Sequence, residues 1–567
     1  MAAIASRAKT TPTDAQFQSA LALARTGDTE GAVRMLERTY ASDAKHPGVR
    51  NALGVLRLER GDFAGAIAML KPLARELPNA ASIQLNLGNA LVAAGRAGDA
   101  IAPLKRATSL DATSALTWYG YARALQTAGR VPEAEPAYVQ ALRSAPEHAE
   151  SRANLAAVYN FLDRAKEGEA TARAVLRLFP SHAGAHVNLA MSLLAQRRWA
   201  EAWAEYEWRE ATTLLDAQRR TWTAPRWDGG AVQGMTVLVH AEQGYGDTLQ
   251  FVRYLPLLRA RGARVILAVP AALQSLLLAS CAYATPLADD VVRLGDAMPA
   301  HDFHVPLTGL PHRLQCTSDT MVFVDDAPYL VTPSDRAGAL ALPAHQTSTR
   351  SLRVGLVWAG SGTHVNDMHR SCGLKALLPL SDEPGIQWVS LQAGERARDL
   401  SAWPKRVPIV DAAPLLQDFA DTAATLAQLD LIVTIDSAVA HLAGALGRPC
   451  VLLLPRIGLD WRWAPAPSVS SAVEFNAALH DRSPDTSHDL SHDLSHDLSR
   501  DLSRDLSHDS KKDASGSAEH DAEFPERTLW YRSARCVRQS ASGDWSSAIA
   551  QVRVLLQATV HAALQAT

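Results

Sequence analysis

The stretch NALGVLRLERGDFAGAIAMLKPLARELP, Asn51–Pro78, contains two segments in which apolar residues recur every three or four positions. This spacing predicts two amphipathic helices. Gly61 stands between them, where a turn with a left-handed backbone forms most easily without a Cβ. The glycine recurs every 34 residues along the chain, at Gly27, Gly61, Gly95 and Gly129, and the same step then falls on Asp163 and Arg197. The sequence therefore predicts a stack of about six helix pairs.

Two further series of small residues run at the same period and predict close helix contacts. They are Ala20, Gly54, Gly88, Ala122, Ala156 and Ala190, and Ala32, Ala66, Ala100, Ala134, Gly168 and Ala202. This pattern resembles the tetratricopeptide repeat, a helical solenoid, over residues 13–213. The resemblance implies that the first helix of each repeat lines a concave face that binds a peptide or protein. The alternative is that the repeats only present or dimerise the domain that follows.

The composition of the 567 residues limits the classes of function. The net charge of −3 argues against a broad nucleic-acid-binding surface, and 47% apolar residues are ample for packed cores. The first residues contain no continuous apolar segment of a secretory signal, and no apolar stretch is long enough to cross a membrane. Five scattered cysteines suit a reducing compartment, so we expect a cytoplasmic protein.

Tryptophans gather where the repeats end, at Trp199, Trp203, Trp208, Trp222 and Trp227. We interpret the first of them as part of a capping helix that covers the open end of the solenoid. The turn-rich segment Pro225–Gly230 then predicts a domain boundary.

Beyond this boundary the period changes to short β-rich runs that alternate with helices. Strands are expected at 235–240, 263–270, 352–360 and within 429–455, each followed by a loop and a helix. This alternation predicts two Rossmann-like halves, residues 231–345 and 350–567, that face each other across a cleft. In such sheets ligands bind beyond the carboxyl ends of the strands.

A low-complexity tract interrupts the second half. Residues 487–509 repeat a Ser-His-Asp-Leu unit almost unchanged, and we expect a disordered insertion over about 466–525. A metal site on its histidines, His488, His492, His496 and His508, is the less favoured interpretation. The segment 528–539 predicts that the ordered domain resumes after the insertion.

The loop HAEQGYGDTLQF places Asp247 at the start of a helix, after Gln243, Gly244 and Gly246. Its glycines allow a ligand to approach the backbone, and an N-terminal helix end favours anions. Asp247 is either a general base for an acceptor hydroxyl or simply a helix cap.

Two further loops follow strands of the second half. In TIDSAVAHLAGALG, the helix start after the strand has free N–H groups that can bind a diphosphate. Its candidate donor-binding residues are Asp436, Ser437, Ala438 and His441. The alternative is a capping aspartate and a packed core histidine. In WAGSGTHVNDMHRS, a phosphate cradle is expected from Ser361, Gly362, Thr363 and Arg370.

Three motifs in order, within 240–258, 430–449 and DWRW at Asp460–Trp463, resemble bacterial tetratricopeptide proteins with a heptosyltransferase-like domain of glycosyltransferase family nine. The resemblance implies a GT-B fold and inverting transfer from a nucleotide-diphosphate sugar, without a metal or other cofactor. It places the base at Asp247 and the donor motif at Asp436–His441. Ala438 departs from the glycine that is usual in this motif and adds a Cβ where the diphosphate would approach the backbone.

The fold class expected from the whole sequence is an α solenoid followed by an α/β glycosyltransferase of the GT-B type. We expect a cytoplasmic enzyme that modifies a protein recruited by the repeats. The alternative is a non-catalytic scaffold with a degenerate transferase domain. The sequence leaves the donor sugar, the acceptor and self-association open.

Overall fold

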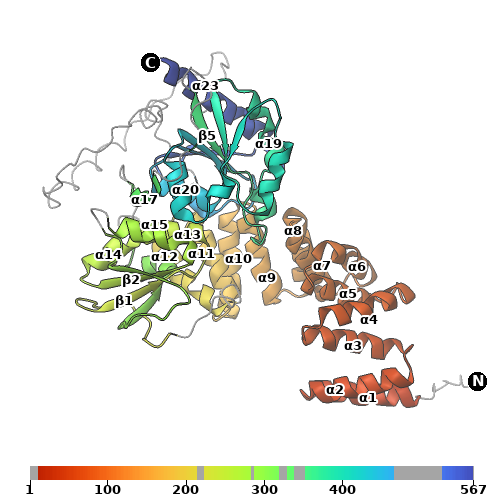
Figure 1. Cartoon of the computed structure of the whole chain (residues 1–567). Helices are drawn as coiled ribbons and strands as arrows, with labels where there is room; N and C mark the ends of the chain where they lie inside the picture. The colour runs from red at the N-terminus through yellow and green to blue at the C-terminus, as the bar shows by residue number, and fades with distance from the viewer. Residues whose placement is uncertain are drawn as a thin grey trace, which may run out of the picture.

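The computed structural model describes residues 11–212, 222–282, 286–317, 328–337, 342, 351–464 and 526–565. The predicted insertion and its histidines lie outside these residues. A helical solenoid extends from an α/β region that contains two sheets, one parallel and one parallel except for a single strand (Figure 1).

The solenoid consists of six successive pairs of antiparallel helices between Pro12 and Tyr206, as the 34-residue period predicts. The helices are α1 (Pro12–Arg25), α2 (Thr29–Ser42), α3 (Pro47–Glu59), α4 (Phe63–Glu76), α5 (Ala81–Ala93), α6 (Ala97–Leu110), α7 (Ala115–Thr127), α8 (Val131–Ser144), α9 (Ala149–Phe161), α10 (Ala165–Leu178), α11 (Ala183–Ala195) and α12 (Trp199–Tyr206).

The turn within each pair has a left-handed backbone, which confirms the prediction from the recurring glycine. Gly61 has φ of 78°, and the two positions that replace glycine keep the conformation, with φ of 63° at Asp163 and 60° at Arg197. The small-residue series also has the expected role. A Cβ on Gly88 would lie 2.2 Å from Cγ of Leu104, so a larger residue there would separate α5 from α6.

The first sheet has the order β3-β2-β1-β4, and all its strands are parallel. Its strands are β1 (Thr236–His240), β2 (Arg264–Val269), β3 (Asp290–Arg293) and β4 (Phe303–Pro306). The helices of this part are α13 (Tyr245–Phe251), α14 (Leu255–Ala260), α15 (Ala271–Cys281), α16 (Leu310–Arg313) and α17 (Ser334–Ala337), with 3-10 turns η3 (Val252–Tyr254) and η4 (Leu307–Gly309).

The second sheet has the order β10-β11-β9-β8-β5-β6-β7 and is parallel except for β10. Its strands are β5 (Leu352–Leu356), β6 (Ile386–Ser390), β7 (Ile409–Asp411), β8 (Leu431–Ile435), β9 (Cys450–Leu454), β10 (Glu526–Arg527) and β11 (Ala534–Arg538). Its helices are α18 (Asp367–Arg370), α19 (Leu374–Leu377), α20 (Phe419–Leu426), α21 (Ala438–Ala445) and α23 (Ser546–Gln565). Further 3-10 turns are η1 (Glu207–Ala211), η5 (Leu378–Asp382), η6 (Glu395–Ala402), η7 (Ala413–Leu415) and η8 (Trp461–Trp463).

The chain returns to the second sheet after the predicted insertion. β11 pairs in parallel with β9, the last strand before residues 465–525. The segment 528–539 thus belongs to the same sheet as the strands before the insertion, as the sequence predicts.

The tryptophans at the end of the solenoid do more than cap it, so the sequence interpretation is corrected here. Trp199 and Trp203 pack edge to face against Trp461, with ring centroids 5.9 and 5.8 Å apart, and Trp199 also contacts Trp530. Trp222 instead stacks on His240 of the first sheet. Trp199 and Trp203 therefore join the solenoid to the α/β region in one apolar core, whereas Trp222 packs against a separate cluster on the first sheet.

Candidate functional site

Asp247 lies in the first turn of α13, the helix that follows β1 in the first sheet. Its Oδ2 accepts a hydrogen bond of 3.1 Å from the N–H of Gly244, which closes a helix-capping interaction. Oδ2 of Asp247 therefore caps the helix, as one of the two sequence interpretations proposed. The other oxygen faces the second half of the α/β region.

Arg462 of η8 connects Asp247 to the second half. Its Nη2 donates to Oδ1 of Asp247 at 2.6 Å, and its Nη1 donates to both carboxylate oxygens of Asp460 at 2.8 and 3.0 Å. Its Nε donates to Oε1 of Gln250, one turn beyond Asp247 on α13. Arg462 is only 7% exposed, so this charge is buried among carboxylates from both halves.

The neighbouring Trp463 connects the same segment to the predicted donor motif. Its indole Nε1 donates to Oδ1 of Asp436 at 2.8 Å, and its ring packs against the imidazole of His441 with centroids 4.7 Å apart. A Cβ on Gly246 would lie 2.7 Å from Cδ2 of His441. The structure thus brings the loop of Asp247 against the start of α21.

We call Gly246, Asp247, Asp436, His441, Asp460, Arg462 and Trp463 the junction site. Trp463 is its most enclosed member, with 1% exposure, and His441 is 5% exposed with Nδ1 2.9 Å from the hydroxyl of Tyr531. His441 is thus buried and hydrogen-bonded within the protein, as expected for a packed core histidine. Ser437 and Ala438 are half-buried at the start of α21, where Ser437 is the N-cap.

Burial dominates the electrostatics of the junction site. It raises the pKa of Asp247, against the opposing charge of Arg462. Burial and then the negative charge of Asp460 raise the pKa of Asp436 to about 6. Burial, followed by the charges of Arg462, Arg253 and Arg370, holds the pKa of His441 well below its usual range, so its imidazole is neutral at pH 7.

Replacing Asp436 with Asn should reveal this raised pKa in the stability of the protein. Asn keeps the acceptor for the Trp463 N–H but removes the titration. Folded Asp436 holds its proton up to about pH 6, whereas the unfolded side chain loses it near 3.8, so the wild type loses stability as pH rises between these values. We expect D436N to gain on the order of 1 kcal/mol relative to wild type between pH 4 and 7. Melting temperatures across this range measure the difference, and parallel curves for the two proteins would contradict it.

The third predicted loop follows β5 and is largely exposed. The hydroxyls of Ser361 and Thr363 lie 2.7 Å apart, and a Cβ on Gly362 would meet no atom within 4 Å. Arg370 closes the loop beside Gly360, and its charge acts on Asp436 to oppose the rise in that pKa. Arg370 therefore lies in the electrostatic field of the junction site, while Ser361–Thr363 face open space.

The solenoid holds this third loop directly. The carbonyl of Phe161, at the end of α9, accepts a 2.7 Å hydrogen bond from Gly458, and the Gly458 carbonyl accepts one from Asn366. The Phe161 ring also packs edge to face on His369, with centroids 5.0 Å apart. Arg538 adds an ion pair to Asp163 in the adjacent repeat turn. The fifth repeat thus fixes the back of the loop that ends at Arg370.

The end of the solenoid also holds the first loop. Gln243 exchanges hydrogen bonds with the hydroxyl of Tyr206, and the guanidinium of Arg209 donates to Glu242 at 2.6 and 3.0 Å. Arg209 is 1% exposed, so this ion pair is buried. Gln243, expected to face an acceptor, is therefore also a contact to the solenoid.

Sequence reasoning did not assign roles to Asp460, Arg462 and Trp463. Their signal was present in the DWRW motif, whose Asp and Arg are two residues apart and whose aromatic residues flank the charge. The sequence alone does not indicate that this short turn packs against α13 and the end of the solenoid.

Among the described residues, no group of three or more His, Cys, Asp and Glu is arranged to hold a metal ion. Within the same part of the chain, no helix is long and apolar enough to span a lipid bilayer. All five cysteines are free thiols.

Two family descriptions match the chain. Tetratricopeptide repeat matches residues 17–71, 51–115, 119–162 and 161–211, and glycosyltransferase family 9 (heptosyltransferase) matches residues 393–454. The second match contains β7, α20, β8, the whole of α21 and β9, and thus includes Asp436, Ser437, Ala438 and His441.

Individual proteins match parts of the chain. Protein FlbA of Caulobacter vibrioides is 25% identical over 300 residues, and the chain spans about half of its length (49% of this chain, 50% of FlbA). Among solved structures, the tetratricopeptide protein TTC0263 of Thermus thermophilus is 22% identical with a TM-score of 0.28, covering 32% of this chain and 99% of its own. MamA is 23% identical with a TM-score of 0.26, covering 30% and 98%. The tetratricopeptide-repeat matches therefore cover the first part of the chain, and the match to glycosyltransferase family 9 (heptosyltransferase) covers residues 393–454 of its second part.

Proposed function

We propose that the two sheets form a GT-B glycosyltransferase that transfers a sugar from a nucleotide-diphosphate sugar to an acceptor hydroxyl with inversion. The observation that carries the proposal is the contact of Gly246 with His441, because it joins the loop after β1 to the donor motif after β8. In a single-displacement reaction, the base on one side and the leaving diphosphate on the other must flank the same sugar carbon.

The candidate residues have distinct roles in this proposal. Asp247 accepts the proton of the acceptor hydroxyl, which then attacks the anomeric carbon as the bond to the diphosphate breaks. The N–H groups at the start of α21, behind Ser437 and Ala438, and the guanidinium of Arg370 stabilise the departing diphosphate. Asp436 accepts hydrogen bonds from donor hydroxyls, and Ser361–Thr363 close over the phosphates.

His441 is neutral and buried, and its role in this proposal is to hold the neighbouring loops in place by packing. Its ring supports Gly246 on one side and Trp463 on another, which keeps both loops in register. Arg462 orients Asp247, and its positive charge opposes the rise in the pKa of that carboxylate.

We further propose that the acceptor is a cytoplasmic polypeptide held by the repeats. The contacts of Phe161, Tyr206 and Arg209 with the site loops support this arrangement, because they fix the solenoid relative to the junction site. A chain bound along the repeats would then lie at a fixed distance from Asp247.

Calorimetric titration of the full chain with ADP, CDP, GDP and UDP tests the donor half of the proposal. We expect one of them to bind with micromolar affinity, and we expect R370A to weaken its binding by about tenfold through the loss of a charged phosphate contact. R353A is the matched control, because Arg353 lies at the opposite end of β5. Absence of binding by all four nucleotides would contradict the proposal.

Shortening Phe161 should disturb the donor loop from a distance. In F161A the packing on His369 and Gly458 is lost, while the backbone hydrogen bond to Gly458 can persist. We expect KM for the sugar donor to rise several-fold with a smaller change in kcat, because the loop is less well ordered before binding. F63A, at the start of α4, is the control in the solenoid. Equal KM values in F161A and wild type would show that the loop is held without this ring.

A second candidate function is a scaffold without catalysis. It is favoured by the fact that both oxygens of Asp247 already have partners within the protein, the Gly244 N–H and Arg462. The scaffold predicts no binding of any nucleotide in the same titrations, whereas the transferase requires it.

A further inference from the structure

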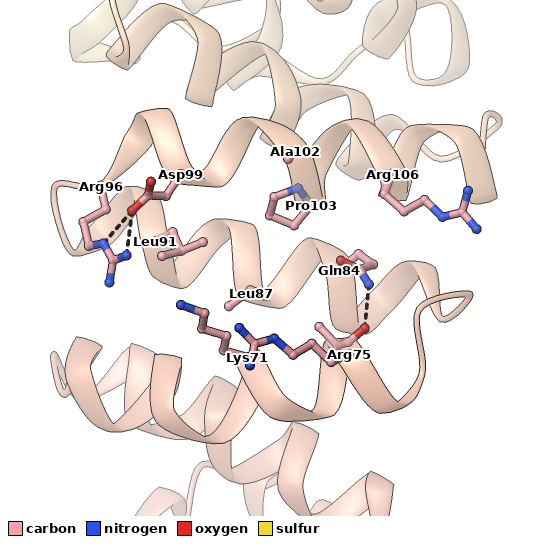
Figure 2. A pocket seen from close by; sticks show the side chains of 11 residues that line it. Lys71, Arg75, Gln84, Leu87, Leu91, Arg96, Asp99, Ala102, Pro103 and Arg106 are labelled. Carbon is pink, nitrogen blue, oxygen red and sulfur yellow. Dashed lines mark hydrogen bonds and ion pairs between the residues drawn. The ribbon is translucent and has the colours of Figure 1, made fainter.

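A groove opens on the solenoid between α4 and α6, far along the chain from the junction site (Figure 2). Its volume is about 480 Å³. Gln84, Leu87 and Leu91 of α5 form its floor, and they are 7%, 7% and 5% exposed. α5 packs against both α4 and α6, so the second helices of two neighbouring repeats form the walls. The groove is therefore distinct from the face that the first helices were expected to form.

The rim of the groove is positively charged. It carries Lys71 and Arg75 on α4, and Arg96 and Arg106 on or beside α6, against the single acid Asp99. Four positive charges and one negative charge give the lining a net charge of +3, whereas the whole chain has −3. Asp99 is already paired with Arg96 at 2.6 Å, and Arg106 donates to the amide oxygen of Asn79.

Lys71 and Arg75 are the two rim cations that indicate which ligand the groove would bind. They are four residues apart on α4, so the two like charges share one face of the helix and repel each other. Both side chains are exposed, and within the described residues neither has a hydrogen-bond or ion-pair partner. Together with Arg106 on the facing wall, they flank an apolar floor of two leucines one helical turn apart (Figure 2).

We propose that this groove binds an acidic, leucine-containing segment of a partner polypeptide. The carboxylates of such a segment would pair with Lys71, Arg75 and Arg106, and a large aliphatic side chain would cover Leu87 and Leu91. Charge-assisted bonds across the rim would set orientation, and burial of the aliphatic group would add affinity. This proposal rests on the part of the proposed function that gives the repeats a polypeptide partner, and it does not depend on sugar transfer.

Fluorescence anisotropy with a labelled synthetic peptide of repeating Asp-Glu-Leu units tests the groove in the full chain. We expect saturable binding that weakens as salt rises, and we expect K71E/R75E to weaken it by about tenfold or more through charge repulsion. The matched control is R143E/R177E, because Arg143 and Arg177 occupy the position of Arg75 in later repeats. A peptide with Asn, Gln and Leu in the same order should not bind. Circular dichroism checks that the variants remain folded.

Three results would overturn the proposal. They are no binding of the acidic peptide, equal losses in the K71E/R75E and R143E/R177E variants, and binding that appears only when residues 487–509 are deleted. The last result would assign the groove to the chain's own Asp- and Leu-rich tract. Because no nucleotide sugar is present, failure here leaves the transferase proposal untouched, and loss of transfer in D247N leaves peptide binding unchanged.

Discussion

D247N should lose sugar transfer by about 10²–10⁴-fold in kcat while it keeps its fold and its affinity for the nucleotide. The amide cannot accept the proton of an acceptor hydroxyl. Its oxygen can still accept a hydrogen bond from Arg462, whose Nη1 also keeps both hydrogen bonds to Asp460. The loss should therefore appear in the chemical step, and initial-rate assays with the identified nucleotide sugar measure it.

The chain offers a close structural control for this substitution. Asp421 in α20 is 2% exposed and, like Asp247, accepts from an arginine, Arg336 at 2.6 Å, and from a backbone N–H, that of Gln417. D421N should lose stability but little kcat. Equal turnover in wild type and D247N would remove Asp247 from the mechanism, and equal losses in D247N and D421N would reduce its role to structure.

R462M should be the most destabilising single substitution in the junction site. Methionine fills much of the space but leaves the carboxylates of Asp247 and Asp460 without their cation in a buried region. Breaking a buried ion pair from one side costs about 3–5 kcal/mol. We expect the free energy of unfolding to fall by about 3 kcal/mol. Urea denaturation at pH 7 measures it.

The sign of the electrostatic effect can be tested in the same variant. The charge of Arg462 opposes the rise in the pKa of Asp247, so its removal raises that pKa further. A carboxylate whose pKa is raised in the folded state makes the protein less stable as pH increases. The free energy of unfolding of R462M should therefore move closer to that of the wild type in acid. The double variant D247N/R462M should be less than additive, because the unpaired carboxylate is gone. R406M is the control, since the Arg406–Asp382 pair is exposed and should contribute less than about 1 kcal/mol. A deficit in R462M no larger than in R406M would contradict this account.

Local patterns predicted most of the fold because their causes are local. The left-handed turn at Gly61, the small-residue contact at Gly88 and the strand of β8 each depend on residues that are neighbours in the sequence or in the repeat. Even the loss of glycine at Asp163 preserved the turn, since the stacked helices on both sides impose it.

The sequence was less informative about contacts between distant segments. Asp247 and Arg462 are 215 positions apart, and their pairing depends on how η8 packs between the solenoid and the sheets. The same packing makes Trp199 and Trp203 part of a joint core, which a pattern confined to the repeats cannot indicate. The phosphate-binding role of Ser361–Thr363 and the predicted domain limits remain predictions.

A crystal structure of the chain with the nucleoside diphosphate that binds best tests most directly whether the two loops serve one reaction. The account predicts phosphates at the N-terminus of α21 beside Arg370, with the carboxylate of Asp247 turned toward the terminal phosphate. A nucleotide seated on any other surface, or one at α21 from which Asp247 is walled off by the Arg462 pair, would contradict it.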